Sequence, residues 1–212
     1  MSNILIVDNN EIFRRGVVGI IRDNFDDTVI HEAAYGRDAL NKTKAQNFNM
    51  SLVDVSLPDM NGFDVMKTLQ QNGSQMPILL LSSYPEEIYA LRALRAGASG
   101  YLTRHCTACE LVAAVSKVLR GGKYINPSFS EKLISELGSN GEKKVISHES
   151  LTDREFRVFC ELASGKPAKL IANELFLSIK TISTYRARIL KKMAMKNNAE
   201  IISYAIRQGL IN

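Results

Sequence analysis

Four polar side chains in the first half of the sequence are of the types that bind and accept a phosphoryl group. They are Asp8, Asp54, Ser82 and Arg104. An aspartate can take a phosphoryl group as a nucleophile, and a second carboxylate can help to hold a hard divalent cation. A hydroxyl and a cationic side chain can bind the phosphoryl oxygens. If the fold gathers these four residues, they would form an acyl-phosphate site.

Repeated strand–helix units would bring these four side chains together. Apolar runs predict strands at 4–7, 29–33, 50–55, 78–82 and 100–102. Helical periodicity predicts helices at 12–22, 39–46, 62–70, 86–96 and 108–119, the last opened by a capping box. This alternation predicts an α/β fold, a doubly wound parallel sheet of five strands. In such a sheet the functional crevice lies beyond the carboxyl ends of the strands, where all four side chains would stand.

The rest of the chain is predicted to be helical. A short helix is possible at 127–137, and the polar, glycine-containing stretch 138–144 is typical of a linker. Four helices are then predicted at 153–163, 168–176, 179–193 and 198–208. Thr152 with Glu155 forms a capping box, and Ser178 and Asn197 are N-cap residues. The last helix carries five apolar residues, more than packing on one neighbour requires, which favours pairing with a second copy.

Charge is unevenly distributed along the 212 residues. The net charge is +5, yet residues 1–124 hold 13 basic and 13 acidic residues, so the C-terminal part carries the whole excess. Eight basic residues and one acidic residue lie within 166–196. Such a field suits a polyanion, either nucleic acid or an anionic membrane surface. A solvated helix face is the alternative, but because the charge lies inside a patterned helical segment we favour a polyanionic ligand.

The helix predicted at 179–193 has an apolar face and a basic, hydroxyl-bearing face. Ile182, Ile189 and Met193 share the apolar side. Small and hydroxyl side chains near its start would read base edges, while lysine and arginine would bind phosphates. The predicted DNA-binding residues are Lys169, Lys180, Thr181, Ser183, Thr184, Ala187, Arg188 and Lys191.

These motifs resemble two known families. The segments 4–8, 52–62, 80–83 and 96–104 resemble a receiver domain. The segments 151–155 and 171–193 resemble the LuxR-type helix-turn-helix, and the two together resemble NarL/FixJ-type response regulators. The resemblance implies a flavodoxin-like receiver at 1–124, a linker at 125–147 and an all-α, four-helix DNA-binding domain at 148–212.

The resemblance also implies a function and partners. The protein would be a two-component transcription regulator and not an enzyme, phosphorylated on Asp54 by a sensor histidine kinase. Phosphorylation would control dimerisation and binding to double-stranded DNA. The longest apolar run is the five residues 111–115 and there are three cysteines, so we expect a cytoplasmic protein without a membrane segment.

Site roles follow from the same resemblance. The implied Mg²⁺ site comprises Asp8, Asn9, Asp54 and the backbone carbonyl of Ser56. Ser82 and Tyr101 would be the switch residues, and Arg104 would bind the phosphoryl group. Two positions depart from the family pattern: Asn9 replaces an acidic residue, which should weaken Mg²⁺ binding, and Arg104 replaces lysine. Glu11 could compensate for the lost charge.

Other interpretations remain open. A receiver acting as a phosphate-independent protein-interaction module, with DNA binding intact, would agree with the two departures. A small phosphatase or phosphotransferase using Asp54 would explain the acidic crevice but not the basic segment. His105, Cys106 and Cys109 could suggest a metal or redox site, but three local ligands are too few, and we favour an incidental helix cap.

Overall fold

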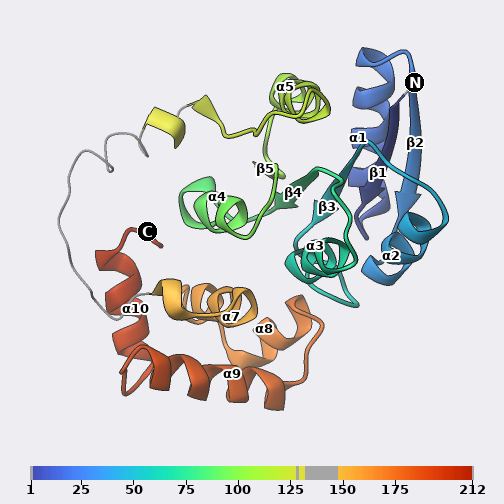
Figure 1. Cartoon of the computed structure of the whole chain (residues 1–212). Helices are drawn as coiled ribbons and strands as arrows, with labels where there is room; N and C mark the ends of the chain where they lie inside the picture. Colours follow the sequence, from blue (N-terminus) through green and yellow to red (C-terminus); the bar gives the residue numbers. More distant parts are fainter. Residues whose placement is uncertain (1, 128, 132–147, 212) are drawn as a thin grey trace. The chain divides into compact units, whose positions relative to one another are not determined.

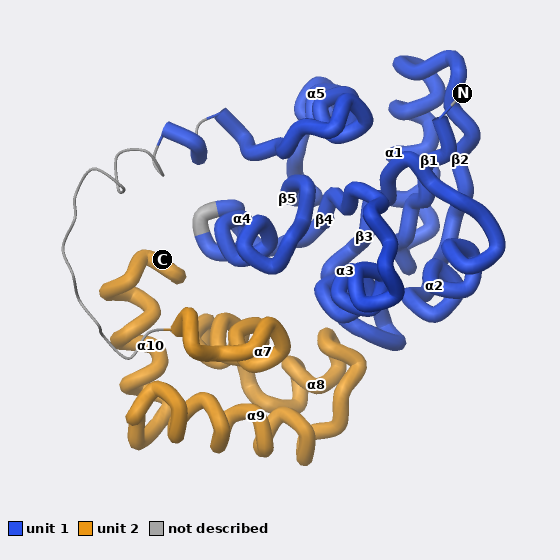
Figure 2. Tube along the Cα trace, in the orientation of Figure 1, with its two compact units in different colours: residues 1–139 blue, residues 140–212 orange. Residues whose placement is uncertain are grey.

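The computed structural model describes residues 2–127, 129–131 and 148–211. The chain divides into two compact units, Met1–Ser139 and Asn140–Asn212 (Figure 2). The division falls inside 132–147, which lies outside the described residues, as does most of the short helix predicted at 127–137. Of that predicted helix, Pro127 and 129–131 are described, and they are helical.

A parallel sheet of five strands forms the centre of the first unit. The strands are β1 (Ser2–Val7), β2 (Thr28–Ala33), β3 (Met50–Asp54), β4 (Ile78–Ser82) and β5 (Gly100–Thr103). Their order is β2-β1-β3-β4-β5. The fold class and the five predicted strands are therefore confirmed. The central strands are nearly continuous apolar runs because helices cover both faces of the sheet.

Helices cover this sheet (Figure 1). They are α1 (Glu11–Asn24), α2 (Gly36–Ala45), α3 (Gly62–Gln71), α4 (Glu86–Arg95) and α5 (Ala108–Leu119). Helices α1 and α5 share one core with alternate strand residues, so they lie on the same face. Because Ile4, Ile6 and Leu52 belong to that core, Asp8 and Asp54 continue the same alternation at the strand ends.

Helix α2 begins three residues earlier than predicted, because its first turn is capped from elsewhere in the chain. Its own N-cap residue, Tyr35, makes no side-chain capping bond. Instead the carboxylate of Asp59 accepts the backbone N–H groups of Gly36 and Arg37, both at 2.9 Å. The cap is 23 residues away in sequence, so no local signal could indicate it.

The second unit is helical. It contains a short 3₁₀ turn at His148–Ser150 and helices α7 (Asp153–Ala163), α8 (Ala168–Glu174), α9 (Ile179–Lys192) and α10 (Asn198–Arg207). The predicted capping box of Thr152 and Glu155 is confirmed, and so are the N-caps Ser178 and Asn197. Among the described residues, no helix is long and apolar enough to cross a membrane.

The prediction that the second helix of this unit runs to residue 176 was wrong. Helix α8 ends at Glu174, and Phe176 takes a left-handed conformation with a φ of 54°. The N–H of Leu177 donates to the carbonyl oxygen of Ala172 at 2.8 Å, which closes the helix end in the manner of a Schellman motif. Apolar residues continue into the turn between α8 and α9. The prediction from periodicity alone therefore placed the end of this helix two residues too late.

Gly62 brings helix α3 directly against the end of β3. Its N–H donates to the carbonyl oxygen of Val55 at 3.1 Å. A Cβ atom at this position would lie 2.4 Å from the carbonyl oxygen of Asp54 and 2.9 Å from the Cα of Val55. Since both obstacles are backbone atoms, a side chain here would displace the segment that carries Asp54.

We therefore expect Gly62→Ala to destabilise the chain by about 1–3 kcal/mol, the cost of overpacking a closed site. Gly16→Ala is the matched control, because Gly16 lies within α1 and nothing is within 4 Å of an added Cβ. There alanine should add about 0.5–1 kcal/mol of stability. Chemical denaturation of the full chain measures both effects. Equal effects of the two substitutions would contradict this account of α3.

Candidate functional site

Two carboxylates lie buried side by side at the carboxyl edge of the sheet. Asp8 directly follows β1 and Asp54 ends β3, and β1 and β3 are neighbours in the sheet. Their exposed fractions are 0% and 1%. Two buried negative charges so close together require a cationic partner.

Arg104 is that partner. Its Nη2 lies 2.6 Å from Oδ2 of Asp8 and 2.9 Å from Oδ2 of Asp54. Its backbone N–H donates to the carbonyl oxygen of Ser82 at 2.7 Å, which holds the start of the β5–α5 connection against β4. Its guanidinium carbon lies 4.4 Å from the ring centre of Phe13 on α1. The four side chains predicted to converge are thus at one edge, and a fifth residue, Phe13, joins them.

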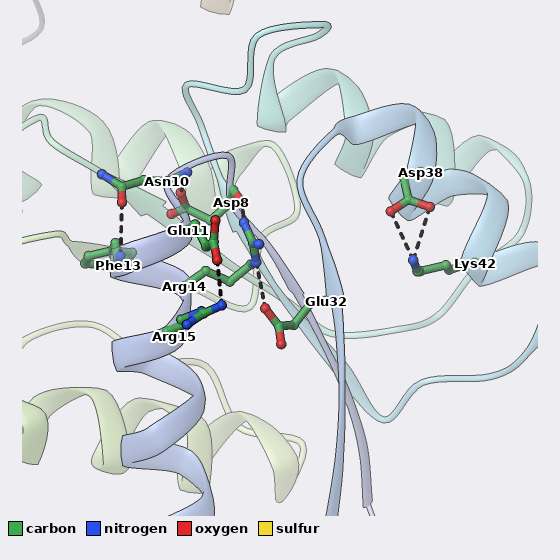
Figure 3. A network of polar contacts seen from close by, with 9 residues as sticks. All are labelled: Asp8, Asn10, Glu11, Phe13, Arg14, Arg15, Glu32, Asp38 and Lys42. Atoms are coloured by element: carbon green, nitrogen blue, oxygen red, sulfur yellow. Dashed lines mark hydrogen bonds and ion pairs between the residues drawn. The ribbon is translucent and has the colours of Figure 1, made fainter.

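A polar network fixes the loop between β1 and α1 (Figure 3). Oδ1 of Asp8 accepts the N–H of Asn10 at 2.8 Å, and Oδ1 of Asn10 accepts the N–H of Phe13 at 3.0 Å. Arg14 donates from Nη1 to the carbonyl oxygen of Asp8 at 2.6 Å and from Nε to Glu32 at 2.7 Å. The loop therefore sets both the Asp8 carboxylate and the first turn of α1, which carries Phe13.

The surroundings of the Asp54 carboxylate disfavour its ionised form. Burial raises the pKa of Asp54 above its usual value, the Arg104 guanidinium lowers it, and the Asp8 charge raises it again. Arg104 and the Ser56 backbone are near enough to act on that pKa, yet neither Asp54 oxygen receives a well-formed hydrogen bond from any described residue. Apart from the ion pair between Oδ2 and Arg104, the lone pairs of this carboxylate are available to a cation or to a phosphorus atom.

The oxygens at this edge fit a hard divalent cation, because two buried carboxylates and backbone carbonyls are its preferred ligands. Asn9 is exposed. Glu11, considered as a compensating charge, forms an ion pair with Arg15 at 2.7 Å instead. Among the described residues, no group of three His, Cys, Asp or Glu side chains could hold a metal. The protein would therefore supply two acidic ligands.

Ser82 and Tyr101 meet at the backbone of one residue, Tyr84. The Ser82 hydroxyl accepts the N–H of Tyr84 at 3.2 Å, and the Tyr101 hydroxyl donates to the carbonyl oxygen of Tyr84 at 2.8 Å. Both side chains are buried, and burial raises the pKa of Tyr101 above its usual value. The β4–α4 connection is thus held by both predicted switch residues.

Cys106 and Cys109 lie on either side of Thr107, the N-cap residue of α5. Thr107 and Glu110 form the capping box that opens α5. Burial, with a contribution from Glu110, raises the pKa of the Cys106 thiol to about 11. A thiol with that pKa is almost wholly protonated near neutral pH and is a poor nucleophile or metal ligand.

Helix α9 presents the predicted faces. Ile182, Ile189 and Met193 are buried. Of the eight predicted DNA-binding residues, Thr181 is half-buried and the other seven are exposed. The hydroxyls of Ser183 and Thr184 donate to the carbonyl oxygens four residues before them, both at 3.0 Å. Their lone pairs face solvent and can accept hydrogen bonds from base edges.

Internal ion pairs reduce the basic charge available for a ligand. Lys192 lies 2.6 Å from Glu155, and Lys166 lies 2.8 Å from Glu161 and 2.7 Å from Glu174. Glu155 and Glu161 belong to α7, outside the segment in which the sequence count was made. The count of seven net charges therefore overstated the field on this surface.

Helix α10 uses much of its apolar surface inside its own unit. Ile201, Tyr204 and Ala205 are buried, Ile202 is half-buried, and Ile206 is 56% exposed. The surplus available for pairing is therefore smaller than the sequence suggested. Helix α10 also contacts the basic helix, because Nε of Arg186 donates to Oδ1 of Asn198 at 2.6 Å.

Comparison with known proteins covers both units. Residues 4–116 match the response regulator receiver domain family, and residues 149–205 match the bacterial regulatory proteins of the luxR family. The response regulator UvrY of Escherichia coli O6:H1 is 30% identical over 100% of this chain and 97% of its own length. The transcriptional regulatory protein LiaR of Bacillus subtilis (strain 168) is 30% identical over 100% of both chains.

A solved structure of RcsB from Salmonella enterica serovar Typhimurium, bound to promoter rprA in the presence of phosphomimetic BeF3-, has a similar fold. Its TM-score is 0.62 at 19% sequence identity, over 96% of this chain and 98% of that chain. At this identity the likeness concerns the fold alone.

The electrostatics of Asp54 generate a stability prediction. Because its folded-state pKa is raised, the ionised group costs stability as the pH rises above the unfolded value of 3.8. Asp54→Asn should therefore stabilise the chain by about 1–3 kcal/mol at pH 7, and the gain should shrink as the pH falls towards 3.8. Thermal and chemical denaturation across this pH range measure it.

Asp59→Asn is the control for that substitution. The Asp59 carboxylate accepts two backbone N–H groups, so an amide there loses an acceptor and should destabilise the chain by about 0.5–2 kcal/mol. A loss of stability at both positions would show that the Asp54 carboxylate is better satisfied than its surroundings indicate.

Proposed function

Because this chain belongs to the two-component response regulators that join a receiver domain to a LuxR-type DNA-binding domain, we propose that phosphorylation of Asp54 controls its binding to promoter DNA. Its relatives are transcriptional regulators and not enzymes. The observation that carries the proposal is the buried Asp54 carboxylate, poor in hydrogen bonds and bordered by Asp8 and Arg104.

The geometry suits acyl-phosphate formation. An Asp54 oxygen attacks the phosphorus of a phosphoryl donor, such as the phosphohistidine of a sensor kinase, while the bond from phosphorus to the donor breaks. Receiver domains generally bind Mg²⁺ at the phosphorylation site. Here Asp8, Asp54 and the backbone carbonyl of Ser56 would hold the ion, which offsets the charge on the phosphoryl oxygens. Arg104 would bind those oxygens through its guanidinium.

Two hydrogen bonds at Tyr84 offer a route from the site to the surface. If the Ser82 hydroxyl turns towards a phosphoryl oxygen, its bond to the Tyr84 N–H at 3.2 Å is lost. The same backbone segment holds Tyr101 through the Tyr84 carbonyl, so both switch residues would respond together. We propose that this movement changes the receiver surface that controls dimerisation.

The second unit would act on DNA as a homodimer. The exposed basic and hydroxyl side chains of α9 would enter the major groove, and a two-fold pair of such helices would read two half-sites. We assign the receiver to 1–124, the linker to 125–147 and the DNA-binding domain to 148–212. We expect the protein to act in the cytoplasm with a sensor histidine kinase as its phosphoryl donor.

A phosphate-independent receiver is a second candidate, and the pairing of Arg104 with both carboxylates favours it. In that case the ion pairs would keep Asp54 permanently neutralised, and protein contacts would provide control. The two candidates differ in one measurable respect, the uptake of a phosphoryl group by Asp54.

Incubation with Mg²⁺ and a small phosphoryl donor such as acetyl phosphate should add one phosphoryl group to the intact protein, as measured by mass spectrometry. Asn9→Asp should raise the yield, because a second acidic residue in this loop strengthens metal binding. Asp54→Asn is the control and should remain unmodified. An unmodified wild-type protein, with Asn9→Asp modified or not, would favour the phosphate-independent candidate.

Two adjacent lysines test the DNA-binding surface. Lys191 is exposed, and Lys191→Ala should weaken binding to all duplexes about equally and reduce the salt slope by about 0.9. Lys192→Ala is the control, since Lys192 pairs with Glu155; it should lower stability and leave the slope nearly unchanged. Fluorescence anisotropy with a labelled duplex at several salt concentrations measures the slope. A slope unchanged by Lys191→Ala would exclude this lysine from the phosphate contacts.

A further inference from the structure

A single nitrogen of Arg104 holds the oxygens that a divalent cation would need. Nη2 is 2.6 Å from Oδ2 of Asp8 and 2.9 Å from Oδ2 of Asp54. A divalent ion at this site would have to bind the same two carboxylates, and both are almost completely buried. The guanidinium and the ion would therefore compete for the same pair of carboxylates.

The net charge of the site makes binding of the Arg104 guanidinium and binding of the divalent ion mutually unfavourable. The site contains two buried carboxylates, and Asn9 adds no third negative charge. A guanidinium already offsets one of the two charges. A divalent ion bound beside an unmoved guanidinium would place two cations within reach of only two carboxylates. Repulsion between like charges is strong in such a dry site, so binding one cation disfavours the other.

Phe13 explains why Arg104 stays in this position. Its ring centre lies 4.4 Å from the guanidinium carbon, within the range of a cation–π contact. Arginine suits this contact because its planar group can stack on a ring while its nitrogens donate to carboxylates, which an ammonium group does less well. The ring is itself held in place by packing against the α1–α5 core and by the Asn10 bond to the Phe13 N–H.

We propose that Arg104, seated on Phe13, is a built-in competitor of the divalent cation, and that it withdraws from Asp8 and Asp54 when the metal binds. Phe13 is then a positioning residue whose ring sets the metal affinity of a pocket that it does not ligate. The inference rests on the proposed acyl-phosphate site and deepens it by naming the groups that regulate metal entry.

Mg²⁺ titration of the full chain at constant ionic strength tests the proposal, with binding heat and the unfolding midpoint as readouts. Phe13→Leu keeps an apolar side chain and removes the aromatic face. It should lower the Mg²⁺ concentration for half-saturation about two- to fivefold, the effect expected from losing a partly buried cation–π contact. Arg104→Lys should act in the same direction.

Phe25→Leu is the matched control. Phe25 packs against the same core from the other end of α1, where its N–H donates to the carbonyl oxygen of Ile21. This variant should lose stability and keep the wild-type half-saturation. A double variant gives a stricter test: in the Arg104→Lys background, Phe13→Leu should cause little further change in Mg²⁺ affinity, because the guanidinium that stacks on the ring has gone.

Half-saturation unchanged in both Phe13→Leu and Arg104→Lys would overturn the proposal, and so would an equal shift in Phe25→Leu. If wild-type protein shows no Mg²⁺ response, Arg104→Lys combined with Asn9→Asp must show one, and no response there also overturns it. The titration uses no phosphoryl donor. A chain that binds Mg²⁺ as stated but is never phosphorylated would therefore refute the proposed function and leave this inference standing.

Discussion

The first unit is organised around two carboxylates that the strand ends place together and remove from water. Asp8 and Asp54 end neighbouring strands on the same face of the sheet, and almost none of their surface is exposed. Such a pair is tolerated only with a cation close by, and Arg104 supplies it from the connection after β5. The β1–α1 loop, the first turn of α1 and the start of the β5–α5 connection all take their positions from this requirement.

In the second unit, polar contacts between helices hold the charged helix α9 in place. Helix α9 must bury one face and keep a basic face in water, and one of its charges, Lys192, pairs with the neighbouring helix α7. Lys192 binds the capping carboxylate Glu155, which ties the end of α9 to the start of α7. Arg186 binds Asn198 and so ties α9 to α10. The remaining exposed lysines and arginine are therefore presented on a helix whose orientation is set by polar contacts as well as by packing.

Local signals made much of this architecture predictable. Buried parallel strands are continuous apolar runs, and the caps Thr152, Ser178 and Asn197 act on residues three positions away. Contacts between distant segments were not predictable. The sequence placed Arg104 near Asp54 but could not show that it also binds Asp8, 96 residues away, or that Phe13 supports it. The Asp59 cap of α2 and the Lys192–Glu155 pair were missed for the same reason.

We propose that the Asp54 site controls the DNA-binding unit, and one measurement tests that link directly. It is the affinity of the full chain for promoter DNA before and after treatment with a phosphoryl donor and Mg²⁺, beside Asp54→Asn treated in the same way. Treatment should tighten binding by wild-type protein and leave the Asp54→Asn variant unchanged. Equal affinities of treated and untreated wild-type protein, or a change that persists in Asp54→Asn, would contradict it.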